Sequence, residues 1–326
     1  MNLFEEISDM FSRELASHGR AFVNYQALSG VEVKDMTIDG FPAKLFFNPA
    51  RVRSVMADVS PEALQKRACF LCPDGLEPLQ LTTVWDSPTG QTYFIRVNPF
   101  PIFNHHFTIS SSIHERQTFA PHMESMLHLA QAMPEMSIFY NGPMCGASAP
   151  DHMHFQAVPR HSMPIEDHFD TNYAYAVLVQ ESDLQSHLAA LEKVLSMASI
   201  PENASQTGSL TVGASRTEEW EPRWNIISWY EPESSASVVS NLQDKTRSTG
   251  AADLQPAGRS YNTIVFFRRE SRPQCFFAPE NERILFSPGT VEMGGVGIVA
   301  NRESFDRITP EVLRSMIQEV ADTLCP

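Results

Sequence analysis

Long apolar runs are missing from this chain: no stretch approaches the roughly 18 consecutive residues that a membrane-spanning helix requires. Basic residues are missing from the N-terminus, where residues 1–10 carry acidic side chains in place of the basic ones that open a signal peptide. These two absences predict a soluble, cytoplasmic protein that does not bind membranes.

A paired set of cysteines is also missing. The chain has five cysteines, an odd number, at irregular spacings, namely Cys69, Cys72, Cys145, Cys275 and Cys325. This pattern argues against a disulfide framework. Reduced thiols are therefore available to bind a metal ion.

Positive charge is scarce. The sequence has 24 Lys and Arg against 39 Asp and Glu, which gives a formal net charge of -15. Such an acidic surface repels phosphodiester backbones, and no strong basic patch offsets it, so nucleic acid is not an expected partner. A small anionic substrate remains compatible, because a few buried arginines can reverse the potential inside one cleft.

What the chain does contain is typical of a globular protein of about two domains, by the loose guide of roughly 150 residues per domain. It has 326 residues, of which 42% are hydrophobic and 19% charged. Hydrophobic periodicity predicts helices over 1–20, from 60–61 onward, and over 120–133, 183–197 and 310–320. Alternation predicts strands within 21–52 and over 92–97, 106–110, 137–140, 224–229, 261–267 and 296–299. The segment 231–259, rich in Ser, Asp, Gly and Gln, is expected to be a long mobile loop.

The organising stretch runs from Cys145 to Gln156, with the sequence CGASAPDHMHFQ. If residues 152–156 form a strand, side chains of period two put His152, His154 and Gln156 on one face and two apolar residues behind them. Half-buried strands do carry incidental histidines. Two histidines with an amide next in line favour a functional site.

The segment Cys69-Phe-Leu-Cys72 is followed at once by the turn Pro73-Asp-Gly75. A CxxC motif in a turn directs two thiolates toward one ion, whereas a redox CxxC opens a helix in a βαβ unit. We therefore favour zinc, which needs four protein ligands in a structural site. His114 and His152 are the third and fourth ligands of choice. Spacing alone does not exclude His105, His106 and His122.

Several arginines are candidate phosphate contacts. Arg51 and Arg53 follow the strand-like run that ends near residue 48, and Arg268, Arg269 and Arg272 follow the strand predicted at 261–267. Exposed arginines are common, so each could equally be a solvated surface residue.

The second half of the chain appears as a weaker copy of the first. The strand at 296–299 precedes Pro310 and its helix at the spacing with which the strand at 107–110 precedes Pro121 and its helix. In that register the candidate metal ligand His114 corresponds to Glu303 of the second copy. The predicted site therefore lies in the first copy alone. We expect two related α+β halves, 1–165 and 166–326.

A neutral imidazole attacks phosphorus if a backbone carbonyl holds its other nitrogen as N–H. His154 is the candidate nucleophile, and the turn at Gly146 and Ser148 offers amides and a hydroxyl for phosphate oxygens. Gln156 can donate its amide to a non-bridging oxygen. No general base for water is evident, so these residues predict transfer of a phosphorus-containing group and not hydrolysis.

These motifs resemble the histidine triad (HIT-like) superfamily in its transferase branch, which contains galactose-1-phosphate uridylyltransferase, diadenosine tetraphosphate phosphorylase and the GDP-hexose phosphorylases. The resemblance rests on the Gly146 to Gln156 stretch, on Cys69, Cys72 and His114, and on Asn98-Pro-Phe-Pro101. It covers residues 45–160 well. Within the superfamily the pattern is most like an uncharacterised bacterial group with the signature Gly-Ala-Ser-Ala-Pro-Asp-His, so the resemblance does not supply the substrate.

The resemblance implies an α+β fold of HIT-like antiparallel sheets with flanking helices, and a ping-pong nucleotidyl transfer through His154. The donor would be a nucleoside diphosphate sugar or a dinucleoside polyphosphate, and the acceptor phosphate or a sugar phosphate. Ser148 would bind the leaving phosphate, Gln156 the α-phosphate and Asn98 the nucleotide. A structural zinc would be held by Cys69, Cys72, His114 and His152, and a homodimer is compatible with this branch.

Two departures from the branch concern the site itself. Asp151 lengthens the spacing from Ser148 to the first histidine by one residue relative to the uridylyltransferase, and Gln156 stands where a triad hydrolase has its third histidine.

Two other functions compete with the transferase. One is a non-catalytic nucleotide-binding protein on the zinc-stapled scaffold, and the other is a thiol redox protein based on Cys69 and Cys72.

Overall fold

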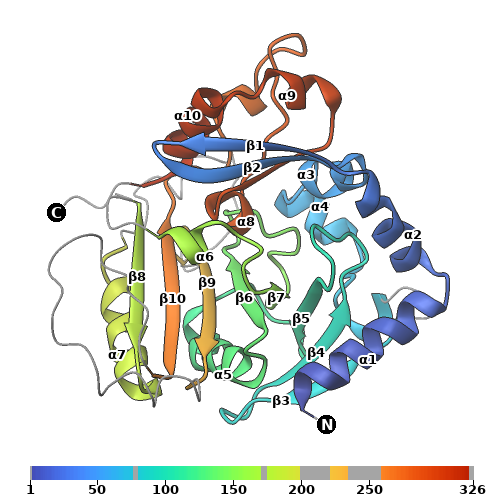
Figure 1. The fold of residues 1–326 in the computed structure, drawn as a ribbon. Coiled ribbons are helices and arrows are strands. Elements are labelled where there is room, and N and C mark those ends of the chain that lie inside the picture. Colours follow the sequence, from blue (N-terminus) through green and yellow to red (C-terminus); the bar gives the residue numbers. More distant parts are fainter. Residues whose placement is uncertain (1, 76–79, 170–174, 199–220, 234–257, 323–326) are drawn as a thin grey trace, which may run out of the picture.

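The computed structural model describes residues 2–75, 80–169, 175–198, 221–233 and 258–322. Two sheets form the framework, one of three strands and one of eight (Figure 1). The small sheet contains β1 (Glu32–Ile38), β2 (Phe41–Phe47) and β11 (Val296–Val299). None of the helices in the described residues combines the length and the hydrophobicity that a membrane span requires.

The large sheet has the order β3-β4-β5-β7-β6-β9-β10-β8, and each of its neighbouring pairs is antiparallel. Its strands are β3 (Thr83–Asp86), β4 (Thr92–Val97), β5 (Phe107–Ser111), β6 (Met136–Asn141), β7 (His154–Pro159), β8 (Ala176–Glu181), β9 (Trp224–Glu231) and β10 (Ser260–Phe267). An antiparallel large sheet with flanking helices confirms the predicted α+β fold class, and the small sheet joins the antiparallel pair β1 and β2 to the parallel strand β11.

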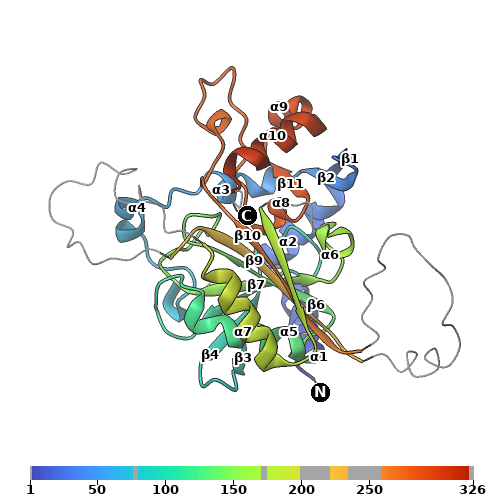
Figure 2. The same cartoon turned by 90° about the vertical axis from the view of Figure 1, so that its left-hand side faces the viewer.

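Each face of the large sheet is covered by a different layer (Figures 1 and 2). One core lies between the sheet and the helices α1 (Leu3–Ala16), α2 (Arg20–Ala27), α5 (Met123–Ala132) and α7 (Leu184–Leu195). The other lies between the sheet and the small sheet with α8 (Thr290–Met293), α9 (Arg302–Arg307) and α10 (Pro310–Val320). Shorter helices α3 (Val52–Val55), α4 (Pro61–Lys66) and α6 (Ile165–His168) lie in the connections.

An internal repeat is visible in the large sheet. The run β5-α5-β6-β7 gives the spatial order β5-β7-β6, and the run β8-α7-β9-β10 gives the order β8-β10-β9. The two units meet where β6 pairs with β9, Ile138 opposite Ser228. The six strands from β5 to β8 are therefore arranged with approximate two-fold symmetry about this pair, and β3 and β4 extend the sheet on one side only.

This repeat is not the one that the sequence register predicted. The strand at 296–299 is β11, which pairs in parallel with β2 in the small sheet, Gly297 opposite Leu45. The strand at 107–111 instead lies inside the large sheet between two antiparallel neighbours. The predicted correspondence of His114 with Glu303 is therefore wrong, because similar strand and helix spacing arose in elements with different partners.

Most predicted elements are confirmed within one or two residues. The first helix ends at Ala16 and not near residue 20, and the strand considered at 152–156 spans His154–Pro159. A third difference lies near the N-terminus. Residues 20–27, predicted as part of an extended run, form helix α2. Ala21 and Tyr25 are its buried residues, and their spacing of four places them on one helical face. A mobile loop was predicted over 231–259; Glu231 is the last residue of β9, and residues 234–257 lie outside the described part of the chain.

Candidate functional site

The candidate site is built on β7 and the loop before it. Phe155 and Ala157 point into the core with the helices, whereas Val158 belongs to the core with the small sheet. By alternation, His154 and Gln156 share the face of Val158. The chemistry-bearing residues therefore lie between the large sheet and the layer that carries α8 and β11. His152 precedes the strand, which begins at His154.

Four side chains converge beside this strand. The donor atoms of Cys69, Cys72, His114 and His152 all lie within 4.8 Å of one another. His152 Nδ1 is 3.3 Å from Cys69 Sγ and 3.5 Å from Cys72 Sγ, and His114 Nδ1 is 3.3 Å from Cys72 Sγ and from His152 Nδ1.

These distances fit a tetrahedral ion. Zinc bonds of about 2.3 Å to sulfur and about 2.0–2.1 Å to nitrogen give tetrahedral edges of roughly 3.3–3.8 Å. The outer nitrogen of His152, Nε2, lies 2.9 Å from the carbonyl oxygen of Ser111, which fixes the tautomer and frees Nδ1 for the ion. Burial opposes ionisation of Cys69, but hydrogen bonds from His152 and the backbone outweigh it and lower the pKa of this thiol to about 6. The group can bind a metal through four protein ligands.

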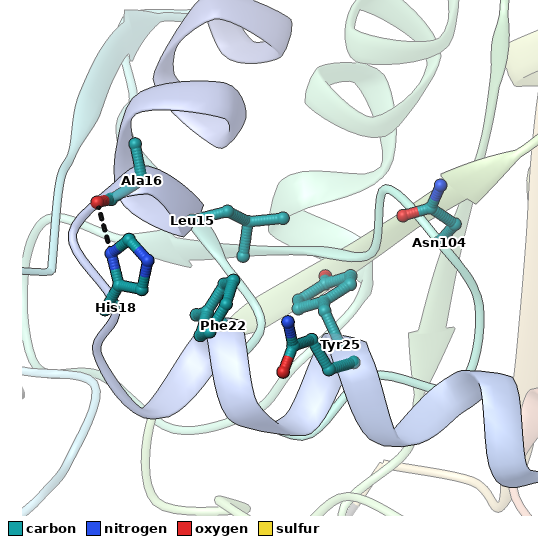
Figure 3. A pocket seen from close by; sticks show the side chains of 7 residues that line it. Leu15, Ala16, His18, Phe22, Tyr25 and Asn104 are labelled. Atoms are coloured by element: carbon teal, nitrogen blue, oxygen red, sulfur yellow. Dashed lines mark hydrogen bonds between the residues drawn. The ribbon is translucent and has the colours of Figure 1, made fainter.

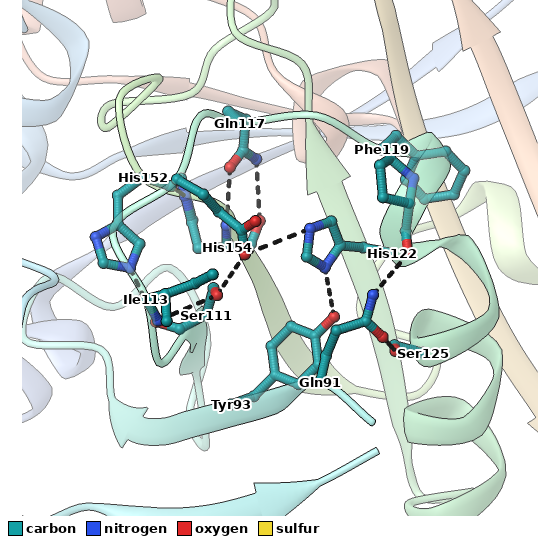
Figure 4. A network of polar contacts seen from close by, with 12 residues as sticks. Gln91, Tyr93, Ser111, Ile113, Gln117, Phe119, His122, Ser125, His152 and His154 are labelled. Atoms are coloured by element: carbon teal, nitrogen blue, oxygen red, sulfur yellow. Dashed lines mark hydrogen bonds and ion pairs between the residues drawn. The ribbon is translucent and has the colours of Figure 1, made fainter. Parts of the chain in front are cut away.

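The three competing histidines have other partners. The ring of His122 lies 2.6 Å from the Tyr93 hydroxyl and 3.5 Å from a carboxylate oxygen of Glu115, in a buried polar network beside the ligand cluster (Figure 4). His105 stacks on Phe11 with ring centroids 4.2 Å apart. His106 contacts Gln156.

His154 is held at both its backbone and its ring. The amide of Gln117 accepts from the His154 N–H at 2.8 Å and donates to the His154 carbonyl at 3.0 Å (Figure 4). The ring atom Nδ1 lies 2.8 Å from the carbonyl oxygen of His152, to which it can only donate, so Nε2 keeps the lone pair. Burial lowers the pKa of His154 to about 4. The ring is therefore neutral at pH 7.

His106 orients the side chain of Gln156. The sequence did not predict this role for His106. The backbone N–H of Ile102 donates to His106 Nδ1 at 3.2 Å, so the proton of the neutral ring lies on Nε2, which is 2.9 Å from Gln156 Oε1. Burial lowers the pKa of His106 to about 3. The oxygen of Gln156 is thus engaged, and its amide N–H groups remain available to a ligand.

Two further residues complete this arrangement. Asn98 Nδ2 lies 3.4 Å from Gln156 Oε1, so the predicted nucleotide contact lies next to the predicted phosphate contact. Tyr25 of α2 accepts from the backbone N–H of His106 at 3.1 Å and donates to its carbonyl at 2.8 Å. No signal in the local sequence could have found this role of Tyr25, because 81 residues separate it from His106.

Tyr25 also lines a hollow of about 410 Å³ between α1 and α2 (Figure 3). Its lining is mainly apolar and comprises Leu15, Ala16, His18, Phe22, Tyr25, Gln26 and Asn104. The hollow contains none of the predicted site residues.

The turn before His152 is packed against the C-terminal part of the chain. Gly146 has φ +94°, and a Cβ there would lie 2.7 Å from the Cα of Gly289. Asn141 Oδ1 accepts from the backbone N–H of Thr290 at 2.7 Å and so ties the end of β6 to the start of α8. Ser148 is exposed on this turn. Only glycine satisfies both the left-handed conformation and the close approach at residue 146.

Arg51 is the predicted arginine that reaches the site. Its Nη1 donates to the carbonyl of Phe100, in the Asn98–Pro101 segment, and its charge lowers the pKa of His106 in addition to the larger effect of burial. Its Nε is buried with no hydrogen-bond partner in the described part of the chain. The side chain of Arg53 lies outside the described residues.

The arginines after β10 are engaged elsewhere. All five N–H groups of Arg268 are occupied by protein acceptors: Val320 O, Asn225 Oδ1, Pro288 O, Glu270 O and Ser271 O. Arg268 is only 2% exposed, so the prediction that it binds substrate is wrong, because no donor is left for a phosphate. Arg272 donates to Ser287 and to the carbonyls of Val55 and Ala57, and Arg269 donates to Glu319, so both brace neighbouring segments.

Comparisons with known proteins add the fold relationship. Residues 10–159 match the sequence model of a family described as "Domain of unknown function (DUF4922)". No curated protein matches the sequence. Crystal structures of yeast Ap4A phosphorylase Apa2 are similar over 97% of this chain and 98% of theirs, with 13% identity and a TM-score of 0.55.

The same enzyme in complex with Ap4A matches over 95% of this chain and 97% of its own, with 13% identity and a TM-score of 0.56. Its complex with AMP matches over 97% and 98%, with 14% identity and a TM-score of 0.55. The chain shares the Apa2 fold. The likeness extends over nearly the whole length of both proteins, beyond the residues 45–160 on which the sequence resemblance rested.

Proposed function

We propose that this protein is a nucleotidyltransferase or phosphorylase that acts on a nucleoside diphosphate sugar or a dinucleoside polyphosphate through a covalent nucleotidyl-His154 intermediate. The observation that carries the proposal is the contact of His154 Nδ1 with the carbonyl of His152 at 2.8 Å. Because this contact fixes the proton on Nδ1 of a buried neutral ring, Nε2 has the lone pair that a nucleophile requires.

In the first step His154 Nε2 forms a bond to the α-phosphorus, and the bond from phosphorus to the leaving-group oxygen breaks, with the electron pair departing on that oxygen. In the second step an oxygen of phosphate or of a sugar phosphate attacks the same phosphorus and releases His154. Gln156 donates its amide to a non-bridging oxygen and Ser148 binds the leaving phosphate. Asn98, the Gly146 amide and Arg51 contact the rest of the donor substrate.

Transfer is favoured over hydrolysis because Gln156 cannot act as a general base for water. Its oxygen is engaged by His106 Nε2 at 2.9 Å, and an amide cannot take a proton from water at neutral pH. The acceptor is therefore a group that already carries a negative oxygen, as phosphate and sugar phosphates do.

A structural zinc is proposed at Cys69, Cys72, His114 and His152. Four protein ligands leave no open coordination position, so the ion would stabilise the fold and take no part in the transfer. The ligands come from the loop after α4, the loop after β5 and the loop before β7, and joining them holds the Ser148 turn beside His154.

The repeat in the large sheet supports two related halves, 1–165 with the catalytic residues and 166–326 without them. Strand β10 corresponds to β7 in the spatial order, and its sequence, SYNTIVFF, contains no histidine. The second half would then contribute structure and, through α8, a residue against which the Gly146 turn packs.

Intact-protein mass measurement tests the function. Brief incubation with a panel of dinucleoside polyphosphates and nucleoside diphosphate sugars should add the mass of one nucleoside monophosphate to the wild-type protein and none to His154→Ala. His105→Ala, which alters a neighbouring histidine that contacts Phe11, should still form the adduct. Tight nucleotide binding without an adduct, unaffected by His154→Ala, would instead identify a non-catalytic nucleotide-binding protein.

A further inference from the structure

Arg96 of β4 is a buried arginine on the face of the large sheet that carries the candidate site. Its neighbours Ile95 and Val97 belong to the core with the helices, so the Arg96 side chain lies on the opposite face. Arg96 lies opposite Thr108 on β5, and Thr108 lies opposite Gln156 on β7 (Figure 1). A row of three side chains thus runs across these strands from Arg96 to the predicted phosphate contact.

Hydrogen bonds hold the guanidinium of Arg96 in place. Its Nε donates to Thr82 Oγ1 at 3.0 Å, and its Nη1 donates to the Leu71 carbonyl at 2.8 Å and to Ser110 Oγ at 3.3 Å. Ser110 lies opposite His154 on β7. The guanidinium therefore contacts the direct cross-strand neighbour of the candidate nucleophile.

The guanidinium of Arg96 keeps binding capacity that the fold does not use. Its three hydrogen bonds go to neutral oxygens, and in the described part of the chain Nη2 donates to no acceptor. Arg268, buried to the same degree, has all five N–H groups occupied. Nη2 of Arg96 is not one of the fully enclosed nitrogens that lack a partner, so this end of the guanidinium touches the surface. Two N–H groups are left for a ligand.

The nucleoside of the donor substrate has room on the Arg96 side of β7. The turn proposed to bind the leaving phosphate lies toward β6, because Gly289, on which Gly146 packs, also packs against Asn141 at the end of β6. Strands β5 and β4 lie on the other side of β7, and Asn98, the proposed nucleotide contact, directly follows β4. Two strand spacings separate β7 from β4, or about 10 Å, which a nucleoside can span. Its base then reaches Arg96.

We propose that Nη2 of Arg96 donates to a carbonyl oxygen of the base in the nucleotide donor and thereby selects guanine or uracil over adenine. This assignment rests on the proposed function. Guanine presents O6 beside N7, and uracil presents carbonyl oxygens, which are the acceptors that a guanidinium binds. Adenine has an amino group in place of O6, so its N–H groups would face those of Arg96 and leave buried donors unpaired. Arg96 contacts the base alone and takes no part in the transfer.

Calorimetric binding of GMP, UMP and AMP tests the assignment. These mononucleotides have no leaving group, so their binding is measured without transfer. We expect the wild-type protein to bind GMP or UMP about tenfold more tightly than AMP, or better, as one good arginine–base contact allows. Arg96→Met removes the donors and keeps an unbranched side chain, and it should abolish most of this difference. Tighter binding of AMP, or no binding of any of the three, by the wild-type protein would overturn the assignment.

The ratio of affinities is measured within one preparation, so a partly unfolded sample does not change it. The same substitution at Arg302, whose side chain is 47% exposed on α9, should leave the ratio unchanged. If Arg96→Met weakens all three nucleotides equally, Arg96 only braces the loop of Leu71 and the assignment is wrong. The order in the wild-type protein is a test that needs no variant.

Single-turnover adduct formation separates this assignment from the proposed function. Diguanosine, diuridine and diadenosine tetraphosphate are compared, and the guanosine or uridine donor should react faster than the adenosine donor. If the protein shows the expected order of binding but forms no adduct, the proposed function fails and the base assignment stands. If adducts form and the adenosine donor reacts as fast as the others, the base assignment fails and the proposed function stands.

Discussion

The ring of His154 is hydrogen-bonded to the backbone carbonyl of His152, 2.8 Å away, while the ring of His152 lies in the Cys69, Cys72, His114 cluster. The positions of the two histidines are thus coupled through this hydrogen bond, although their side chains have different surroundings. A displacement of the ligand cluster moves the carbonyl that sets the tautomer of His154. Metal binding and nucleophilicity are therefore expected to be linked through one peptide group.

Replacement of His152 tests this link. His152→Ala should lower the bound zinc from about one equivalent per chain to well below it and decrease the free energy of unfolding by several kcal/mol, since metal binding energy contributes to folding. Adduct formation should fall as well, because the carbonyl of residue 152 loses its anchor. Metal analysis and thermal unfolding measure these effects, and His161→Ala, at a histidine whose side chain is 63% exposed, is the control. Full zinc content in His152→Ala would contradict the ligand assignment.

Replacement of His106 tests the orientation of Gln156. His106→Phe keeps a buried ring but removes the Nε2–H that engages Gln156 Oε1, so the Gln156 amide is free to turn its oxygen toward the phosphate. We expect kcat to fall about 100-fold, the lower end of the effect of losing one donor to a developing charge. Gln156→Ala should have a similar effect, and the double variant should be no worse than either single variant. Additive losses would show that the two residues act independently.

The pH dependence of the first step follows from the pKa of His154, which burial lowers to about 4. Above this value the ring is neutral and nucleophilic, and below it the ring is protonated and inactive. The single-turnover rate with a dinucleoside polyphosphate, which has no terminal phosphate, should be constant from pH 8 to about 5. It should fall tenfold per pH unit below about 4. A decline already centred near the ordinary histidine value of about 6.5 would show that the nucleophile is not this buried ring.

Two glycines with similar backbone angles separate strain from close packing. Gly146 and Gly40 have φ +94° and +91°, but a Cβ at Gly40 would meet no atom within 4 Å, whereas one at Gly146 would meet the Cα of Gly289 at 2.7 Å. Gly40→Ala should decrease the free energy of unfolding by about 1–2 kcal/mol with unchanged activity. Gly146→Ala should decrease it further and slow adduct formation, because the Ser148 turn must move. Chemical denaturation and single-turnover rates provide the comparison.

Much of the fold could be predicted from local sequence patterns. Strand β4 spans Thr92–Val97, the strand that alternation predicts, and α10 begins at Pro310, where Thr309 caps the helix through the backbone N–H of Val312. These features depend on residues within one or two turns of each other. The repeat could not be located in the same way, because which strands pair depends on contacts between distant segments, such as Ile138 opposite Ser228 and Leu45 opposite Gly297.

The candidate site likewise has features that local sequence predicts and features that depend on contacts between distant segments. From the sequence came the candidates: Cys69, Cys72, His114 and His152 as metal ligands, His154 as nucleophile and Gln156 as phosphate contact. Only the tertiary structure decided how they are used. It placed His106 behind Gln156 and Arg96 beside Ser110, and it enclosed Arg268 among backbone carbonyls. Side-chain type is a local property, whereas burial and hydrogen-bond partners, which set tautomer and charge, exist only once distant segments pack together.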